Sequence, residues 1–177
     1  TADSCAGTSG RETSIVRLPE ELQFIANARM DQRTTDARID GCICLITGAT
    51  SGVGYQAARR LAQGGARLVI ICRDREKAVR LREELARDYD TETDVVQADF
   101  SLLQDVRNAA ETIRAQNARI DMLINNAGVH HTGRTLTADG IETVFSVNHL
   151  ASFLLTRLLL PTIVASAPAR IIQVNSQ

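Results

Sequence analysis

The sequence predicts an α/β fold in which helices cover both faces of a doubly wound parallel sheet with strand order 3-2-1-4-5. Three observations predict it. From residue 41 onward, short apolar runs alternate with longer amphipathic stretches, the connections between them are short, and a glycine-rich turn, TGATSGVG at 47–54, follows the first apolar run. Alternation of this kind indicates parallel strands joined by right-handed crossovers.

Five short apolar runs are expected to form the strands. RLVIIC at 67–72 is continuously apolar, as in a strand buried on both faces. The other four are CICLIT at 42–47, DVVQAD at 94–99, IDMLIN at 120–125 and ARIIQVN at 169–175. The chain begins without methionine and stops at this last run, so we expect a fragment whose sheet is truncated before its last strands.

The first two helices are expected after the first two strands. One runs from the glycine turn to about Gln63, where two glycines stop it. The other is the charged amphipathic stretch that ends at Tyr89, with Asp74 as its N-cap. These two stretches supply the crossovers that parallel strands require.

The next two helices are marked by a capping pattern and by length. Ser101 and Gln104 form a capping box that predicts a helix start after the third strand. A longer helix is expected from about Ala138 to Val164, bent or ended near Pro161.

Residues 1–40 are interpreted as an N-terminal extension to the domain at 41–177. The first 15 residues or so are rich in Ser, Thr and Gly and are expected to be disordered. LPEELQFIANAR at 18–29 then has apolar residues at near-helical spacing, which predicts a short helix that packs against the domain.

Composition and charge exclude some classes of function. With 177 residues, 44% hydrophobic and 23% charged, the chain suits one domain with a buried core. Its net charge of −1 argues against a nucleic-acid binder, which is usually strongly basic. No apolar run reaches 18 residues, and the longest is interrupted by His149 and Arg157, so we expect no membrane span.

The four cysteines indicate buried core residues rather than a metal or redox site. Cys42 and Cys44 alternate within one apolar run, but no C-x-x-C pair or nearby histidine completes a metal site. We therefore expect no metal, and a cytoplasmic location or another reducing compartment. The polar N-terminus has no signal-peptide hydrophobic region.

The glycine turn predicts an anion-binding site. Gly48, Gly52 and Gly54 stand between a strand and a helix, and a helix N-terminus offers unpaired N–H groups with a partial positive charge. Glycines let the backbone turn tightly and let a diphosphate approach it. The alternative is a tight turn with no ligand. The spacing G-x-x-x-G-x-G differs from the usual G-x-G-x-x-G and lacks the G-K-[ST] ending of phosphate-loop NTPases.

Together with DMLINNAG at 121–128, this turn resembles the short-chain dehydrogenase/reductase family, from about Gly41 to the end. ADFS, FSVNHLASFLLT and RIIQVNS match further family motifs in the right order, closest to the branch of retinol dehydrogenases, WW-domain oxidoreductases and protochlorophyllide reductases. The resemblance implies a Rossmann-like fold and two groups of site residues. The catalytic residues would be Asn148 and Ser176, and the cofactor-binding residues Gly48, Thr50, Ser51, Gly52, Val53, Gly54, Arg73, Asp99, Phe100, Asn126, Ala127 and Gly128.

Arg73 favours NADP(H) over NAD as the cofactor. An acidic residue at the end of the second strand would bind the ribose hydroxyls and select NAD, but Cys72 and Arg73 stand there. A guanidinium can bind the 2′-phosphate of NADP with two hydrogen bonds. The alternative is a solvated arginine at a helix start, with Asp74 as the cap.

The resemblance implies reversible hydride transfer between NADP(H) and a small apolar carbonyl or alcohol. Ser176 would bind the substrate oxygen, and Asn148 would hold a water in a proton relay or make a hydrogen bond within the fold. The family's tyrosine proton donor, with a lysine four residues later, would fall about a dozen residues beyond Ser176. Neither Tyr55 nor Tyr89 has a lysine at that spacing, so we expect the 177 residues alone to bind cofactor poorly and to lack reductase activity.

Other interpretations stay open beside this one. The chain can be a non-catalytic nucleotide-binding module or a degenerate family member. A sugar-nucleotide epimerase is disfavoured by NNAG, because that branch carries a different motif there. His130 and His131 follow the NNAG loop and either contact substrate or are solvated, and His149 is expected to pack within its helix. A homo-oligomer is left open.

Overall fold

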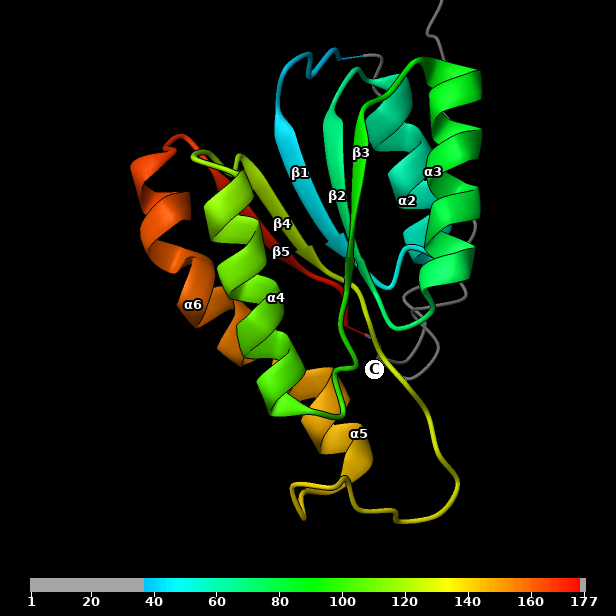
Figure 1. Cartoon of the computed structure of the whole chain (residues 1–177), viewed down its shortest axis with the longest axis vertical. Helices are drawn as coiled ribbons and strands as arrows, with labels where there is room; N and C mark the ends of the chain where they lie inside the picture. The colour runs from blue at the N-terminus through cyan, green and yellow to red at the C-terminus, as the bar shows by residue number, and fades with distance from the viewer. Residues whose placement is uncertain (1–36, 176–177) are drawn as a thin grey trace, which may run out of the picture. The chain divides into compact units, whose positions relative to one another are not determined.

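Five parallel strands form one sheet in the order β3-β2-β1-β4-β5, as the sequence predicts (Figure 1). The structure, a computed structural model, describes residues 37–175, which belong to one compact unit. The register places Leu45 beside both Val69 and Leu123 in the middle of the sheet. The strands are β1 Ile43–Thr47, β2 Arg67–Cys72, β3 Thr93–Gln97, β4 Met122–Asn125 and β5 Arg170–Gln173.

Helices cover both faces of this sheet. In Figure 1, α2 and α3 lie on one side of the strands and α4 and α6 lie on the other. This arrangement confirms the doubly wound architecture and explains why the central strands are apolar on both faces. The helices are α2 Gly52–Gln63, α3 Arg75–Tyr89, α4 Leu103–Gln116, α5 Thr143–Phe145, the π-helix η2 Ser146–Leu150 and α6 Ala151–Ala165.

Alternate residues of each central strand enter two separate cores. Leu45 of β1 packs in the core beneath α4 and α6, and Ile46 packs in the core beneath α2 and α3. Both side chains are fully buried. Cys44 is buried in the second core, and burial raises the pKa of its thiol to about 12, so it is a neutral core residue near pH 7.

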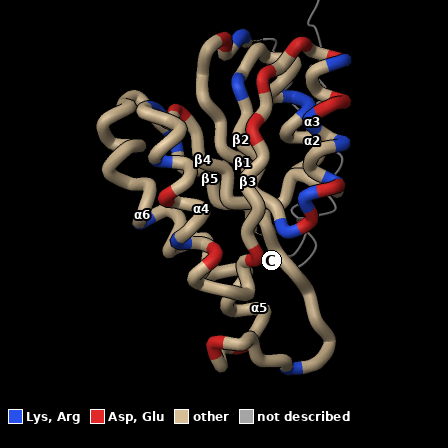
Figure 2. Tube along the Cα trace, in the orientation of Figure 1, with Lys and Arg blue, Asp and Glu red and all other residues tan. Residues whose placement is uncertain are grey.

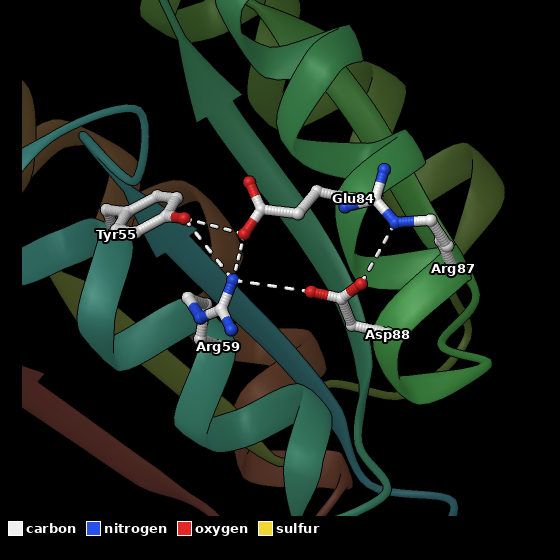
Figure 3. A network of polar contacts seen from close by, with 5 residues as sticks. All are labelled: Tyr55, Arg59, Glu84, Arg87 and Asp88. Carbon is white, nitrogen blue, oxygen red and sulfur yellow. Dashed lines mark hydrogen bonds and ion pairs between the residues drawn. The ribbon is translucent and has the colours of Figure 1, made fainter.

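A polar network joins α2 to α3 on the outer surface (Figure 3). The Tyr55 hydroxyl donates to the Glu84 carboxylate (2.6 Å), and Arg59 pairs with Glu84 and with Asp88. The Arg59 guanidinium also lies over the rings of Tyr55 and Tyr89, 5.8 and 5.4 Å from their centroids. These contacts fix α2, which begins at the glycine turn, against its neighbour.

The longest helix begins later than the sequence predicts. The expected start near Ala138 is wrong: residues before Thr143 form a turn, and Leu136 makes an isolated antiparallel bridge to Glu142. The Glu142 carboxylate accepts the N–H groups of Val144 and Phe145, which caps the helix there. The helix passes through Pro161 and ends at Ala165.

The expected capping box at the start of α4 is also wrong. The N-cap residue is Leu102, which makes no side-chain capping hydrogen bond. The N–H of Leu103 instead donates to the carboxylate of Asp139, 3.1 Å away and 36 residues later in the chain. A contact over that distance in sequence satisfies the helix end, so the local pattern of Ser101 and Gln104 has no capping role.

The continuous helical segment Thr143–Ala165 is long and apolar enough to cross a membrane by length and composition, with a mean hydropathy of 1.4 over its best window. Here it packs on the sheet, because Leu155, Leu159 and Ile163 are buried in the core with α4. Core helices of soluble proteins commonly pass the same test. The segment is therefore weak evidence for a membrane span.

The last strand, β5, lies at an edge of the sheet, although its apolar sequence is typical of a strand buried on both faces. Ile171 and Ile172 are each 39% exposed and Val174 is 43% exposed. Within residues 37–175, β5 pairs only with β4, so its other edge is open. The expected disordered segment and short helix within residues 1–36 lie outside the described residues.

Candidate functional site

A groove of about 570 Å³ lies at the carboxyl ends of β1, β2 and β4. The sheet order reverses between β1 and β4, and open α/β sheets bind ligands at such a switch point. Of the twelve cofactor-binding residues that the sequence analysis named, all but Gly52 line the groove. The lining ones are Gly48, Thr50, Ser51, Val53, Gly54, Arg73, Asp99, Phe100, Asn126, Ala127 and Gly128.

Two positions of the glycine turn require glycine, because the backbone there packs against neighbouring protein atoms too closely for a side chain. Gly48 has a φ of +67°, and a Cβ on it would lie 2.8 Å from the Cα of Ala127. A Cβ on Gly54 would lie 2.4 Å from both the Asn126 amide nitrogen and the Gly48 carbonyl oxygen. Gly52, which does not line the groove, has a φ of +57° that favours glycine for conformation alone.

The N-terminus of α2 is suited to bind an anion. Its N-cap, Ser51, makes no side-chain capping hydrogen bond, and the first turn has no acidic residue. The first-turn N–H groups of a helix have no partner within the helix, and they carry the positive end of the helix dipole. Ser51, Val53 and Gly54 line the groove, so these groups are available to a diphosphate there.

Thr47 fixes the loop after β4 against the glycine turn, a role that the sequence analysis missed. Its hydroxyl oxygen accepts the N–H groups of Asn126 and Ala127, both at 2.9 Å. The Asn126 amide donates in return to the carbonyl oxygens of Thr47 (3.0 Å) and Gly48 (3.1 Å). Hydrogen bonds to Thr47 and Gly48 therefore fix both the backbone and the side chain of Asn126 in the wall of the groove. A threonine that ends a strand directly before a glycine turn is the available signal in the sequence.

Two cations stand at the β2 end of the groove. Arg73 is exposed, and its carbonyl oxygen accepts a hydrogen bond from the Gln97 amide (3.2 Å). Lys77 also lines the groove and pairs with Asp74 at 3.4 Å. Lys77 is an addition to the residues expected from the sequence; it lies in the first turn of α3, shortly after Arg73 and the N-cap Asp74.

Asp74 caps α3, as the sequence predicts. Its carboxylate accepts the N–H of Lys77 at 3.1 Å, and this bond holds the pKa of the carboxyl below its usual value. Beside it, Cys72 is 5% exposed, and burial raises the pKa of its thiol to about 11. The thiol is neutral near pH 7 and adds no negative charge to this end of the groove.

Asp99 and Phe100 form the wall that follows β3. The Asp99 carboxylate accepts the N–H of Ser101 at 2.8 Å, and its own N–H donates to Asp105 at 3.1 Å. Phe100 is 6% exposed and packs in the core. These contacts hold the segment as a shaped turn rather than a free loop.

The two predicted catalytic residues are placed differently. Asn148 lies in η2, where its amide oxygen accepts the Val129 N–H (2.8 Å) and its amide nitrogen donates to the Val129 carbonyl (3.0 Å). Asn148 does not line the groove, but it neighbours Gly128, which does. π-Helical turns often mark functional sites. Ser176 lies outside the described residues.

Three histidines were singled out, and the structure separates them. His131 lines the groove and His130 does not, although both are exposed. His149 stacks on the ring of Phe145, with centroids 5.3 Å apart, as expected for packing within its helix. Within residues 37–175, no group of three or more His, Cys, Asp or Glu side chains is placed to hold a metal ion.

The groove as a whole suits an extended, polyanionic ligand. Its lining combines the cations Arg73 and Lys77, the N-terminus of α2 and the loop that carries His131. Figure 2 shows basic and acidic residues interleaved along α3, the helix whose first turn carries Lys77. A nucleotide with one phosphate beside Arg73 and Lys77 and another at the N-terminus of α2 would match these groups.

A family model described as short chain dehydrogenase matches residues 42–177. The chain belongs to the short-chain dehydrogenase/reductase family. Among its curated relatives, retinol dehydrogenase 12 of Mus musculus is 42% identical over 144 residues, which cover 81% of this chain. The match covers 46% of that relative, so this short-chain dehydrogenase/reductase chain spans about half the length of the curated relatives it matches.

Solved structures of the same family share the fold. A metagenomic short-chain oxidoreductase in complex with NADP has a TM-score of 0.71 and 31% identity, covering 78% of this chain and 64% of that one. A short-chain dehydrogenase from Sphingobium yanoikuyae in complex with NADPH has a TM-score of 0.65 and 34% identity, covering 73% of this chain and 51% of that one. A nicotinamide cofactor is therefore the ligand class that such folds hold.

Proposed function

We propose that this chain is the cofactor-binding part of an NADP(H)-dependent oxidoreductase that acts on a small apolar carbonyl or alcohol. The observation that carries the proposal is the pair of cations, Arg73 and Lys77, at one end of a groove whose centre is a helix N-terminus. Relatives named as retinol dehydrogenases, and family structures in complex with NADP and NADPH, support the same conclusion.

The groups that the groove presents fit the cofactor. Dinucleotides lie across the switch point with the diphosphate on the N-terminus of the first helix, here α2. The close approach of Gly54 to Asn126 leaves no room for a side chain there, so the backbone itself faces the diphosphate. Arg73 and Lys77 would then bind the 2′-phosphate, and Asp99 and Phe100 would lie beside the adenine.

When bound, the nicotinamide would supply or accept the hydride. The chain's own residues position the reacting groups. Asn148 holds Val129 by two hydrogen bonds and so fixes the loop that follows Gly128. Ser176 would donate a hydrogen bond to the substrate oxygen, as the family resemblance implies. Proton transfer would use a tyrosine with a lysine four residues later, a pair that these 177 residues do not contain.

Cofactor selectivity tests the proposal. Arg73→Ala and Lys77→Ala should each weaken NADP⁺ binding more than NAD⁺ binding, by about 1–3 kcal/mol for a lost charged hydrogen bond. Isothermal titration calorimetry with both cofactors measures the difference.

Arg80→Ala is the matched control, because Arg80 lies on the same helix, pairs with Glu76 and does not line the groove. Equal losses for NADP⁺ and NAD⁺ in the first two variants would contradict the assignment. NADP⁺ binding without turnover by a longer form that carries the tyrosine and lysine would favour the non-catalytic alternative.

A further inference from the structure

His131 belongs to a chain of hydrogen bonds that fixes which of its ring nitrogens carries hydrogen. Its Nδ1 lies 3.2 Å from Oγ1 of Thr135, and that oxygen lies 2.9 Å from Oγ1 of Thr143. Thr143 Oγ1 in turn lies 3.0 Å from the carbonyl oxygen of Thr135. The direction of each hydrogen bond follows because each threonine hydroxyl has only one hydrogen to donate.

A carbonyl oxygen only accepts, so the Thr143 hydroxyl donates to it and has no second hydrogen to give. The Thr135 hydroxyl must then donate to Thr143, which uses its own single hydrogen. The remaining contact therefore runs from His131 Nδ1–H to Thr135. A neutral His131 thus carries its hydrogen on Nδ1 and its free lone pair on Nε2.

The loop that carries His131 is tied down on both sides. Val129, two residues before, makes both of its backbone hydrogen bonds with Asn148. Thr135, four residues after, accepts the N–H of Thr143 at 2.9 Å. The imidazole is therefore presented from a braced loop, and Thr143 and His131 line the same groove.

No protein group within residues 37–175 makes a hydrogen bond with the Nε2 atom of His131. Glu142 is a charged group that interacts with His131, and Arg134 also acts on Glu142. The two Glu142 oxygens accept the N–H groups of Val144 and Phe145, at 2.9 and 2.7 Å, so this carboxylate is committed to capping the helix. Nε2 therefore has no hydrogen-bond partner among residues 37–175, and His131 lines the groove.

We infer that His131 is a ligand-binding residue whose Nε2 accepts a hydrogen bond from an N–H or O–H group at the nicotinamide end of the groove. The inference rests on the proposed function, because the cations at the β2 end orient the dinucleotide. Two groups have this chemistry: the carboxamide of the nicotinamide and the hydroxyl of an alcohol substrate. His130, next in sequence but outside the groove, has no such role.

Nitrogen NMR of the histidine rings tests this directly. The 177-residue chain, labelled with ¹⁵N-histidine, has three histidine side chains, and His130→Gln and His149→Gln identify the signals. We expect His131 to be the Nδ1–H form in the free protein. Two conditions are compared: NADP⁺ alone, and NADP⁺ together with an alcohol (cyclohexanol, benzyl alcohol or retinol). At least one of them should shift the Nε2 resonance. 2′-Phospho-ADP-ribose, which lacks nicotinamide, should leave it unchanged.

The conditions under which Nε2 shifts identify the donor. A shift with NADP⁺ alone assigns the carboxamide, and a shift that needs an alcohol assigns the substrate hydroxyl. No shift in either condition, with backbone amides of the glycine turn still responding to NADP⁺, overturns the role of His131 alone. If those amides do not respond to NADP⁺ even in a longer form that carries the tyrosine and lysine, the proposed function fails with it.

A variant pair gives a second measurement. His131→Asn keeps a donor that can reach Thr135 but has no group at the position of Nε2. Its affinity for the ligand identified by NMR should fall about three- to tenfold, as for one neutral hydrogen bond. The matched control His130→Asn and the affinity of both variants for 2′-phospho-ADP-ribose should stay at the wild-type level. Equal affinity of His131→Asn and wild type would overturn the inference.

Discussion

Gly54 shows, at the scale of one residue, how packing and ligand binding impose the same requirement. The position lies at the start of α2 and ends the glycine motif. A Cβ there would meet the Asn126 amide and the Gly48 carbonyl at 2.4 Å, closer than real Cβ contacts allow. Asn126 is held by Thr47 and Gly48, so it cannot give way without breaking hydrogen bonds.

We therefore predict that Gly54→Ala is destabilising although alanine favours helices. The clash should lower the free energy of unfolding by about 1–3 kcal/mol, as for other overpacked sites, and it should also weaken NADP⁺ binding. Urea unfolding followed by circular dichroism measures the first effect. Gly133→Ala is the control, because a Cβ there meets nothing within 4 Å. Equal unfolding midpoints for the two variants would contradict the prediction.

The residues of the site divide into those that sequence can show and those that only the fold brings together. Eleven of the twelve expected cofactor residues line the groove, because each belongs to a short motif at a strand end. Lys77 was missed because it lies in the first turn of α3, outside the motifs, and Thr47 because its hydroxyl holds the loop after β4. Whether Asn148 and Ser176 act on a substrate stays a prediction.

At the scale of an element, α3 depends on the charge of its N-cap. The Asp74 carboxylate accepts the Lys77 N–H, and this bond is the main cause of its lowered pKa, helped by the Lys77 ammonium. Because the folded pKa lies below the unfolded one, protonation favours the unfolded chain. The stabilisation is complete above the usual value of 3.8 and is lost as the pH falls through the folded pKa.

We predict that wild type and Asp74→Ala differ most in stability above about pH 5 and converge as the pH falls further. Asp74→Asn separates charge from capping, since asparagine caps helices without titrating. The stability gap between the Asn and Ala variants should therefore stay constant across the same range. Free energies of unfolding at a series of pH values measure both gaps. A constant gap between wild type and Asp74→Ala would contradict the prediction.

Helix starts are where the sequence predictions were wrong, and both errors have a physical cause. Asp139 lies 36 residues from Leu103, whose N–H its carboxylate accepts, and no local pattern reveals such a contact. Glu142 caps the long helix in place of the expected start near Ala138. The strand order and the first two helices were confirmed. The spacing of apolar residues and the glycines that end a helix are local signals, so the sequence shows them.

At the scale of the whole molecule, the sheet within residues 37–175 has two edge strands, β3 and β5, and β5 is the more exposed of the two. The run RIIQV has the apolar pattern of a buried strand, yet Ile171 and Ile172 are each 39% exposed. Local pattern cannot show which strand lies at an edge, because exposure depends on the neighbours in space. An open edge with apolar side chains invites pairing with another chain.

We therefore predict that the 177-residue chain associates with itself as its concentration rises, through the β5 edge. Ile172→Lys should reduce the association, because a lysine on an edge strand opposes pairing by charge. Sedimentation velocity over a range of concentrations measures it. Val164→Lys is the matched control: Val164 is 65% exposed but lies on a helix, α6, and not on a strand. If Val164→Lys abolished the association and Ile172→Lys left it intact, the contact would run through the helix instead.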